Sequence, residues 1–276
     1  MATISGRSEG KHEATGFPIP ATVAVNKARI QSEQAERQVS VDSLPYFYHV
    51  HLHMPCNQRC IMCVPNGRHP DATLPYEEFV SLFEQIRPCA EHITLIGGEP
   101  LLYPRIDDVL DLLARHPIAV SINTNATRLG DGVSEKLLGL NELHLKCSID
   151  AATRETYYRI RGTDWFDKVV ANINRFSARA AGLSNIKVIL VYVVMRENLG
   201  EVVPFIELFK DTALERIEFH PVRHVGDWVV QNKTGWTFRG AEQICESFSP
   251  DYDRVMDEAR RLGERCGLEI EVQPIP

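Results

Sequence analysis

The sequence lacks the features that would place the chain in a membrane, outside the cell or on a nucleic acid. No stretch approaches the roughly 18 consecutive apolar residues that a membrane span requires, and the N-terminus does not resemble a secretory signal. The 30 Lys and Arg residues are outnumbered by 37 Asp and Glu, so a net charge of −7 leaves no basic field for phosphate backbones. We therefore expect a cytoplasmic protein that binds neither a membrane nor a nucleic acid.

The cysteines lack the pattern of a secreted disulfide framework. There are seven, an odd number, and three of them crowd into one short segment. Thiols clustered in this way in a reduced protein are typical of metal binding.

The composition excludes a disordered chain and predicts three regions. Hydrophobic residues make up 44% and charged residues 24% of the 276 residues, enough for one large α/β domain or two modest ones. Residues 1–40 have little periodicity and are predicted to be a poorly ordered extension with a short helix near Asn26–Arg37. Residues 41–223 form the predicted main domain. Residues 224–276 are predicted to be a C-terminal loop, helix and short strand, the remnant or the start of a further domain.

Strand-like and helix-like segments alternate from Tyr46 onward. Amphipathic segments that begin near Pro75, at Pro104, at Thr163 or Asp164, and after Asn198 are predicted helices. The predicted strands are apolar or alternating runs: Phe47–His53, His92–Ile96, Ala119–Asn123, Leu143–Ile149, Ile186–Val194, Ile217–His220 and Leu268–Val272.

This alternation predicts parallel strands joined by right-handed crossovers. Six such units fit between Tyr46 and Arg223, fewer than the eight of a full barrel. We therefore predict an α/β fold, a partial (β/α)6 TIM-like barrel whose reactive groups lie at the carboxyl ends of the strands.

The two faces of the fourth strand differ in polarity. Leu143, Leu145, Cys147 and Ile149 share one face and are expected to pack against helices, which makes Cys147 a core thiol. His144, Lys146, Ser148 and Asp150 share the other face and are expected to line the barrel.

The three crowded cysteines, Cys56, Cys60 and Cys63, follow the first strand directly. The polar residues Asn57-Gln58-Arg59 between them predict an exposed loop rather than three buried thiols. Structural zinc takes four protein ligands, and a catalytic zinc held by three cysteines so close in sequence would be unusual. Three thiolates that bind a four-iron, four-sulfur (4Fe-4S) cluster explain the number directly and leave one iron open to a substrate or cofactor.

This motif, Cys-x3-Cys-x2-Cys with Met62 before the third cysteine, resembles that of the radical S-adenosylmethionine (SAM) enzymes. The resemblance implies that the cysteines bind the 4Fe-4S cluster and that SAM chelates the remaining iron. It implies one-electron reduction by a flavodoxin- or ferredoxin-type donor, cleavage of SAM, and hydrogen abstraction by a 5′-deoxyadenosyl radical. The substrate would be a peptide or a small molecule such as a sugar.

Later strand ends carry further segments of this resemblance. Gly97-Gly98-Glu99-Pro100 alone would be a tight turn, but it ends the next strand after the cysteine loop, and adjacent glycines let a backbone approach a ligand. The resemblance implies that the following residues contact SAM: Met62, Gly97, Gly98, Glu99, Asn125, Ser148, Asp150 and Arg161. For Arg161, the alternative to a contact with SAM is a surface salt bridge.

Two alternatives stay open at this point. His49, His51 and His53 share one strand face and suit a metal-dependent amidohydrolase-type hydrolase, or else they line the lower barrel. Residues 222–276 hold only Cys245 and Cys266, so the chain resembles the barrel portion of SPASM/twitch-type members without their auxiliary-cluster domain. A truncated or split, non-catalytic partner is therefore the second alternative. The segment Val225–Ser249 is predicted to be an irregular loop, and Tyr252–Cys266 a final helix.

Overall fold

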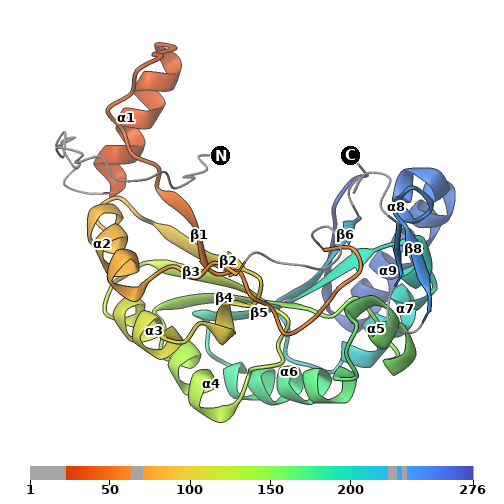
Figure 1. Cartoon of the computed structure of the whole chain (residues 1–276). Helices are drawn as coiled ribbons and strands as arrows, with labels where there is room; N and C mark the ends of the chain where they lie inside the picture. The colour runs from red at the N-terminus through yellow and green to blue at the C-terminus, as the bar shows by residue number, and fades with distance from the viewer. Residues whose placement is uncertain (1–22, 64–70, 223–228, 232–234, 276) are drawn as a thin grey trace.

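The computed structural model describes residues 23–63, 71–222, 229–231 and 235–275. Seven parallel strands form one sheet in the order β1-β2-β3-β4-β5-β6-β9, so that neighbours along the chain are neighbours in the sheet (Figure 1). Each lies within one residue of its predicted position at either end. They are β1 (Phe47–His53), β2 (His92–Gly97), β3 (Ala119–Thr124), β4 (Glu142–Ser148), β5 (Ile186–Val194), β6 (Arg216–Pro221) and β9 (Glu269–Val272).

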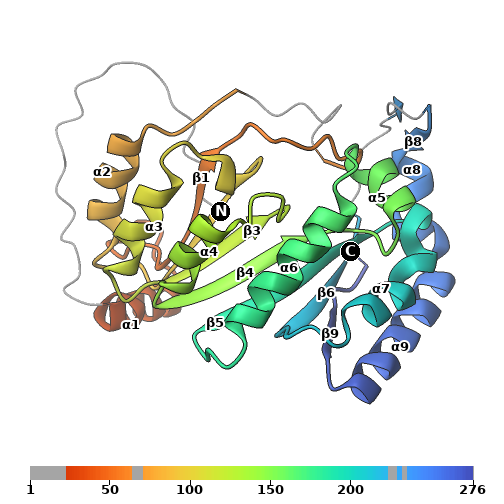
Figure 2. The same cartoon turned by 90° about the horizontal axis from the view of Figure 1, so that it is seen from below.

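The sheet is curved but open. Within the described ranges β1 and β9 each have one neighbouring strand, β2 and β6 respectively, so both are edge strands. The end of β1 also forms a short antiparallel bridge between His53 and Thr73. Figures 1 and 2 show most of the helices along the convex side of the curve, whereas the first helix, α1 (Val23–Ala35), projects from the β1 end of the sheet. The prediction of an α/β fold with a partial TIM-like barrel is confirmed, and β9, which was predicted outside the six-unit barrel, adds a seventh parallel strand beside β6.

The described helices lie between successive strands, except α1, which precedes β1. They are α1 (Val23–Ala35), α2 (Tyr76–Ile86), α3 (Ile106–Ala114), α4 (Asp131–Leu138), α5 (Arg154–Arg161), α6 (Phe166–Ala180), α7 (Val202–Phe209), α8 (Gly240–Gln243) and α9 (Ser249–Cys266), with short 3-10 turns at Pro100–Leu102, Arg196–Glu201 and Cys245–Phe248. None of the helices in the described ranges combines the length and apolar character that crossing a bilayer requires.

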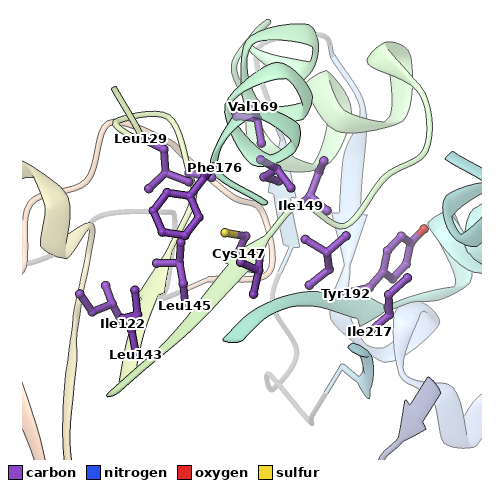
Figure 3. Close-up of a cluster of buried hydrophobic side chains, with 14 of the residues drawn as sticks. Ile122, Leu129, Leu143, Leu145, Cys147, Ile149, Val169, Phe176, Tyr192 and Ile217 are labelled. Atoms are coloured by element: carbon purple, nitrogen blue, oxygen red, sulfur yellow. The ribbon is translucent and has the colours of Figure 1, made fainter. Parts of the chain in front are cut away.

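The core lies between the sheet and the outer helices. Leu145 and Cys147 of β4 are fully buried beside Phe176 of α6 (Figure 3). Leu143 and Ile149 are equally inaccessible, whereas His144, Lys146 and Ser148 on the other face are partly exposed. The prediction for the two faces of β4 is confirmed, and Cys147 is a core thiol.

Two local predictions are wrong. Helix α6 begins at Phe166 without a side-chain cap, rather than at Thr163 or Asp164, because Gly162 ends α5 in a left-handed conformation (φ 69°) and a turn follows. The described part of Val225–Ser249 is not irregular: β7 (Val229–Gln231) pairs antiparallel with β8 (Thr237–Arg239), and Phe238 is fully buried. The remainder of that segment and residues 1–22 lie outside the described residues, and the domain boundaries at residues 40 and 223 stay predictions.

Candidate functional site

The cysteine loop follows β1 and rests on the end of α5. Arg59 N–H donates to the Arg161 carbonyl (3.2 Å), and Ile61 N–H donates to the Ile160 carbonyl (3.0 Å). Ile61 and Ile160 are buried in a small apolar cluster with Met195, Val222 and Phe238, against which Met62 packs. Backbone pairing and apolar contact therefore anchor the segment between the cysteines to a helix about 100 residues later in the chain.

The glycine pair at the end of β2 supports the same loop from the other side. Gly98 N–H donates to the His53 carbonyl (2.9 Å), and Glu99 N–H donates to the Pro55 carbonyl (3.1 Å). A Cβ atom on Gly98 would lie 2.0 Å from the Met54 oxygen. Gly97 has φ 145°, and a Cβ there would lie 2.3 Å from the His53 oxygen. The close approach that these glycines permit is thus to the backbone before Cys56, rather than to a ligand alone.

The Glu99 side chain ties β2 to β3. Its carboxylate is fully buried and accepts hydrogen bonds from Leu101 N–H (3.0 Å), Thr124 Oγ1 (2.7 Å) and Asn125 N–H (2.7 Å). Burial raises the pKa of Glu99, and these hydrogen bonds oppose the rise. A carboxylate accepts about four bonds, so about one acceptor position remains.

Asn125 reaches from β3 back to the cysteine loop. Its Nδ2 donates to Asn57 Oδ1 (2.8 Å) and lies 3.8 Å from Cys56 Sγ, and its Oδ1 accepts from Thr127. Asn57 Nδ2 in turn donates to Thr127 Oγ1 (2.8 Å). The amide network therefore links the third strand end to the first cysteine.

Arg161, the last residue of α5, lies beside the second cysteine. Its guanidinium is buried, with Nη1 3.6 Å from Cys60 Sγ and 3.4 Å from Gln58 Oε1, and Nη2 2.6 Å from Asp150 Oδ2. Gln58 also bonds the Tyr157 hydroxyl. Burial acts to lower the pKa of Arg161, but attraction to Asp150 and Cys60 outweighs it and the pKa rises. Arg161 is consequently a buried cation, not part of a surface salt bridge.

Gln58 corrects the prediction that Asn57-Gln58-Arg59 form an exposed segment. Only 2% of Gln58 is accessible, because its side chain turns inward to Tyr157 and Arg161. Gln58 and Tyr157 are site residues that the sequence reasoning missed. The position of Gln58 between two cysteines of the motif was the feature of the sequence that could have identified it as a site residue.

The thiols of the loop are close enough to influence one another. Burial raises the pKa of Cys56, and it raises the pKa of Cys60 to about 12, while the charge of Arg161 lowers both. The charge interaction with Cys63 also raises the pKa of both Cys56 and Cys60. In the part of the chain that the structure describes, no three His, Cys, Asp or Glu side chains converge on one metal ion, the loop cysteines included. Ligands of a 4Fe-4S cluster bind separate iron atoms and have no need to converge in this way.

The histidines of β1 do not assemble a hydrolase site. His49 and His51 are exposed, and His53 is hydrogen-bonded to Thr73 Oγ1 (2.9 Å). Since no set of three ligands for one metal ion is present in the described ranges, the amidohydrolase-type alternative lacks its metal centre there.

The inner face of the sheet carries a charged network below the strand ends. Glu218 of β6 is 2% exposed and accepts hydrogen bonds from Lys146 Nζ (2.9 Å) and Arg216, and it lies 3.2 Å from His220 Nε2. Burial acts to raise the pKa of Glu218, but these partners outweigh it and lower the pKa to about 2. The inner face is therefore polar, as the alternation in β4 predicts.

The remaining predicted residues have distinct surroundings. Ser148 is partly exposed at the end of β4. Asp150 is fully buried, and its Oδ1 accepts from Val193 N–H (2.7 Å). Cys245 is buried and donates to the Val194 carbonyl (3.3 Å), and Cys266 packs beside the main core. The two C-terminal cysteines thus belong to the packing of the fold.

Sequence comparison identifies related proteins over most of the region that carries this site. The Radical SAM superfamily matches residues 55–209, more than half of the chain. A probable GTP 3′,8-cyclase of Saccharolobus islandicus is 33% identical over 174 residues, which cover 60% of this chain and 54% of that protein. The mycofactocin maturase MftC of Mycobacterium tuberculosis is 26% identical over 155 residues, 55% of this chain and 39% of the maturase.

Solved structures share the fold at low sequence identity. Streptococcus suis SuiB bound to the precursor peptide SuiA superposes with a TM-score of 0.69 at 16% identity, over 91% of this chain and 53% of SuiB. The enzyme anSMEcpe with bound AdoMet and a peptide superposes with a TM-score of 0.59 at 16% identity, over 82% of this chain and 63% of that one. The chain therefore spans about half the length of several of the proteins it matches.

Proposed function

Because this chain belongs to the radical SAM superfamily, we propose that it is an enzyme that cleaves SAM reductively at a 4Fe-4S cluster held by Cys56, Cys60 and Cys63. Enzymes of this superfamily use that cluster and SAM, which together supply a 5′-deoxyadenosyl radical able to remove a hydrogen atom from a substrate. The observation that carries the proposal is the position of the cysteine loop, which is held between the glycine pair, Asn125 and Arg161 at the carboxyl edge of the sheet.

The donor set of the loop fits the cluster. Three thiols from one short loop supply three ligands, and Arg161 and Asn125 each place an N–H group near a sulfur. Because burial raises the pKa of Cys56 and Cys60, both are thiols in the metal-free chain near neutral pH, and metal binding releases their protons.

Two buried polar groups fit the amino acid end of SAM. Glu99 retains about one acceptor position for an ammonium group. Arg161 Nε is buried without a hydrogen-bond partner among the described residues, which leaves a donor for a carboxylate. Ser148 at the end of β4 and Met62 beside the cysteines remain proposed SAM contacts.

Three other residues that were predicted to contact SAM are assigned to holding their neighbours in place. Both oxygens of the Asp150 carboxylate are engaged, Oδ1 with Val193 N–H and Oδ2 with Arg161, so we assign to Asp150 the orientation of Arg161. Gly97 and Gly98 seat the cysteine loop. These residues would act on SAM through the groups that they hold in place.

The proposed substrate is a peptide or a small molecule such as a sugar, bound against the polar inner face of the sheet. SuiB and anSMEcpe, which share the fold, are seen with peptides, and MftC is named as a maturase, which supports a peptide. The one-electron donor is proposed to be of the flavodoxin or ferredoxin type.

Anaerobic reconstitution tests the proposal. The reconstituted protein is expected to hold about four iron and four sulfide per chain and, with dithionite, to convert SAM to 5′-deoxyadenosine. Cys60→Ser is expected to lose both properties, whereas Cys266→Ser, which changes a thiol at the end of α9, should keep them. A colourless protein without iron would contradict the proposal. Full iron without SAM cleavage across a peptide and metabolite panel would favour the non-catalytic partner.

A further inference from the structure

The buried guanidinium of Arg161 is aimed at a cysteine sulfur. Only 6% of Arg161 is exposed, and its Nη1 is 3.6 Å from Cys60 Sγ, within hydrogen-bond range for sulfur. The same nitrogen is 3.4 Å from Gln58 Oε1, an amide oxygen that carries no charge. The charged group that faces Cys60 from the end of α5 is therefore a cation.

Asp150 keeps Arg161 in this position. Asp150 Oδ2 is 2.6 Å from Arg161 Nη2, and both residues are buried, so breaking the pair would leave a buried charge without its counter-ion. Asp150 is itself fixed, because its Oδ1 accepts from Val193 N–H (2.7 Å) and its carbonyl accepts from Asn198 Nδ2 (3.0 Å). The arginine thus has one defined orientation with respect to the sulfur.

The backbone holds the arginine and the sulfur together as well. The Arg161 carbonyl accepts from Arg59 N–H, the residue before Cys60. A Cβ on Gly162, which follows Arg161, would lie 3.0 Å from the Arg59 oxygen, so the loop and the helix end are in direct contact. Motion of Arg161 away from Cys60 would need this contact to open.

We propose that Arg161, in addition to its proposed contact with SAM, raises the reduction potential of the cluster bound through Cys60. The proposal rests on the proposed function, since it needs a cluster at these cysteines. When the oxidised cluster accepts one electron from the external donor, its negative charge grows by one. Hydrogen bonds to sulfur and nearby positive charge stabilise that reduced state and raise the potential.

Potentiometric titration of the reconstituted cluster, followed by electron paramagnetic resonance, tests the proposal. Arg161→Gln removes the charge and is expected to lower the reduced-to-oxidised ratio at a fixed potential by about tenfold or more, which is about 59 mV for a one-electron couple. Arg161→Lys keeps the charge and is expected to recover part of that shift. Arg159→Gln is the matched control on the same helix. Arg159 pairs with Glu155 and Glu197. Its loss should therefore change the reduced-to-oxidised ratio at the same fixed potential by less than about twofold, well below the tenfold change expected for Arg161→Gln.

A measurement on the unaltered protein covers the case in which Arg161→Gln fails to fold. In protein grown with arginine labelled with ¹⁵N in the guanidinium group, the reduced cluster is expected to show hyperfine coupling to ¹⁵N. No coupling, or equal potentials in Arg161→Gln and wild type at equal iron content, would overturn the proposal. A wild-type protein with no cluster signal would instead overturn the proposed function, so the two failures are distinct.

Discussion

Substitution of Gly98 by alanine probes the contact on which the site depends. The added methyl group would lie 2.0 Å from the Met54 oxygen and 2.5 Å from the Pro55 oxygen, whereas ordinary contact begins at 3.4 Å. Both neighbours are backbone atoms, so no side chain can rotate to make room. Either the turn or the cysteine loop must therefore move by more than 1 Å, because the 2.0 Å separation from the Met54 oxygen has to grow to 3.4 Å.

The cost of Gly98→Ala follows from the bonds that such a shift would break. Gly98 N–H to His53 and Glu99 N–H to Pro55 are the two bonds between the turn and the loop. Each contributes about 1 kcal/mol, and a buried group left unpaired costs a further 1–3 kcal/mol. We expect Gly98→Ala to lower the free energy of unfolding by about 3–5 kcal/mol and to abolish iron binding.

Urea unfolding of the metal-free protein, followed by circular dichroism, measures this loss. Gly132→Ala is the control, because Gly132 lies in α4 with nothing within 4 Å of an added Cβ. That change is expected to stabilise the protein by up to about 1 kcal/mol. An unfolding free energy of Gly98→Ala within 1 kcal/mol of wild type, with normal iron content, would refute the reasoning.

Three further predictions concern the thiols, the charged network and the histidines. Serine at any one of the three loop cysteines should reduce bound iron at least about fourfold by elemental analysis, because each thiolate would bind one iron of the proposed cluster. Unchanged iron would exclude that cysteine as a ligand. Glu218, whose pKa is lowered from 4.5 to about 2, stabilises the fold above pH 4.5 and loses that contribution as pH falls toward 2. Between these pH values wild type should lose up to about 3 kcal/mol of unfolding free energy more than Glu218→Gln, and equal losses would show that the network adds no pH-dependent stability. His49→Ala should change SAM cleavage by less than about twofold, since the side chain is exposed within β1, whereas the cysteine loop follows the end of that strand. Loss of cleavage would return the β1 histidines to the active site.

The strands could be predicted from sequence because their signal is local. Ile186–Val194 is a nearly continuous apolar run, and the structure gives β5 the same bounds. Helix α5 was not predicted, because its sequence Arg154–Arg161 is mostly polar, although Thr153 caps its start and Gly162 ends it. Its packing depends on the cysteine loop, which no local pattern reveals.

The candidate site could be located from sequence, but its internal contacts could not. Parallel strands bring their carboxyl ends to one edge, which is why Cys56, Glu99 and Asn125 were expected together. The burial of Gln58 depends on its contact with Arg161, about 100 residues later in the chain. The pairing of Arg161 with Asp150 depends on side-chain geometry between a strand end and the last residue of α5. Asp150 and Arg161 were both expected at SAM, and that expectation stays a prediction; the ion pair between them was not expected.

The central claim is that three cysteines hold a cluster whose fourth iron is open to SAM. The electron paramagnetic resonance spectrum of the dithionite-reduced, reconstituted protein, recorded with and without SAM, tests it most directly. The account predicts a cluster signal whose g values change when SAM is added, because SAM becomes a ligand of the open iron. A cluster spectrum that is unaffected by saturating SAM would contradict it.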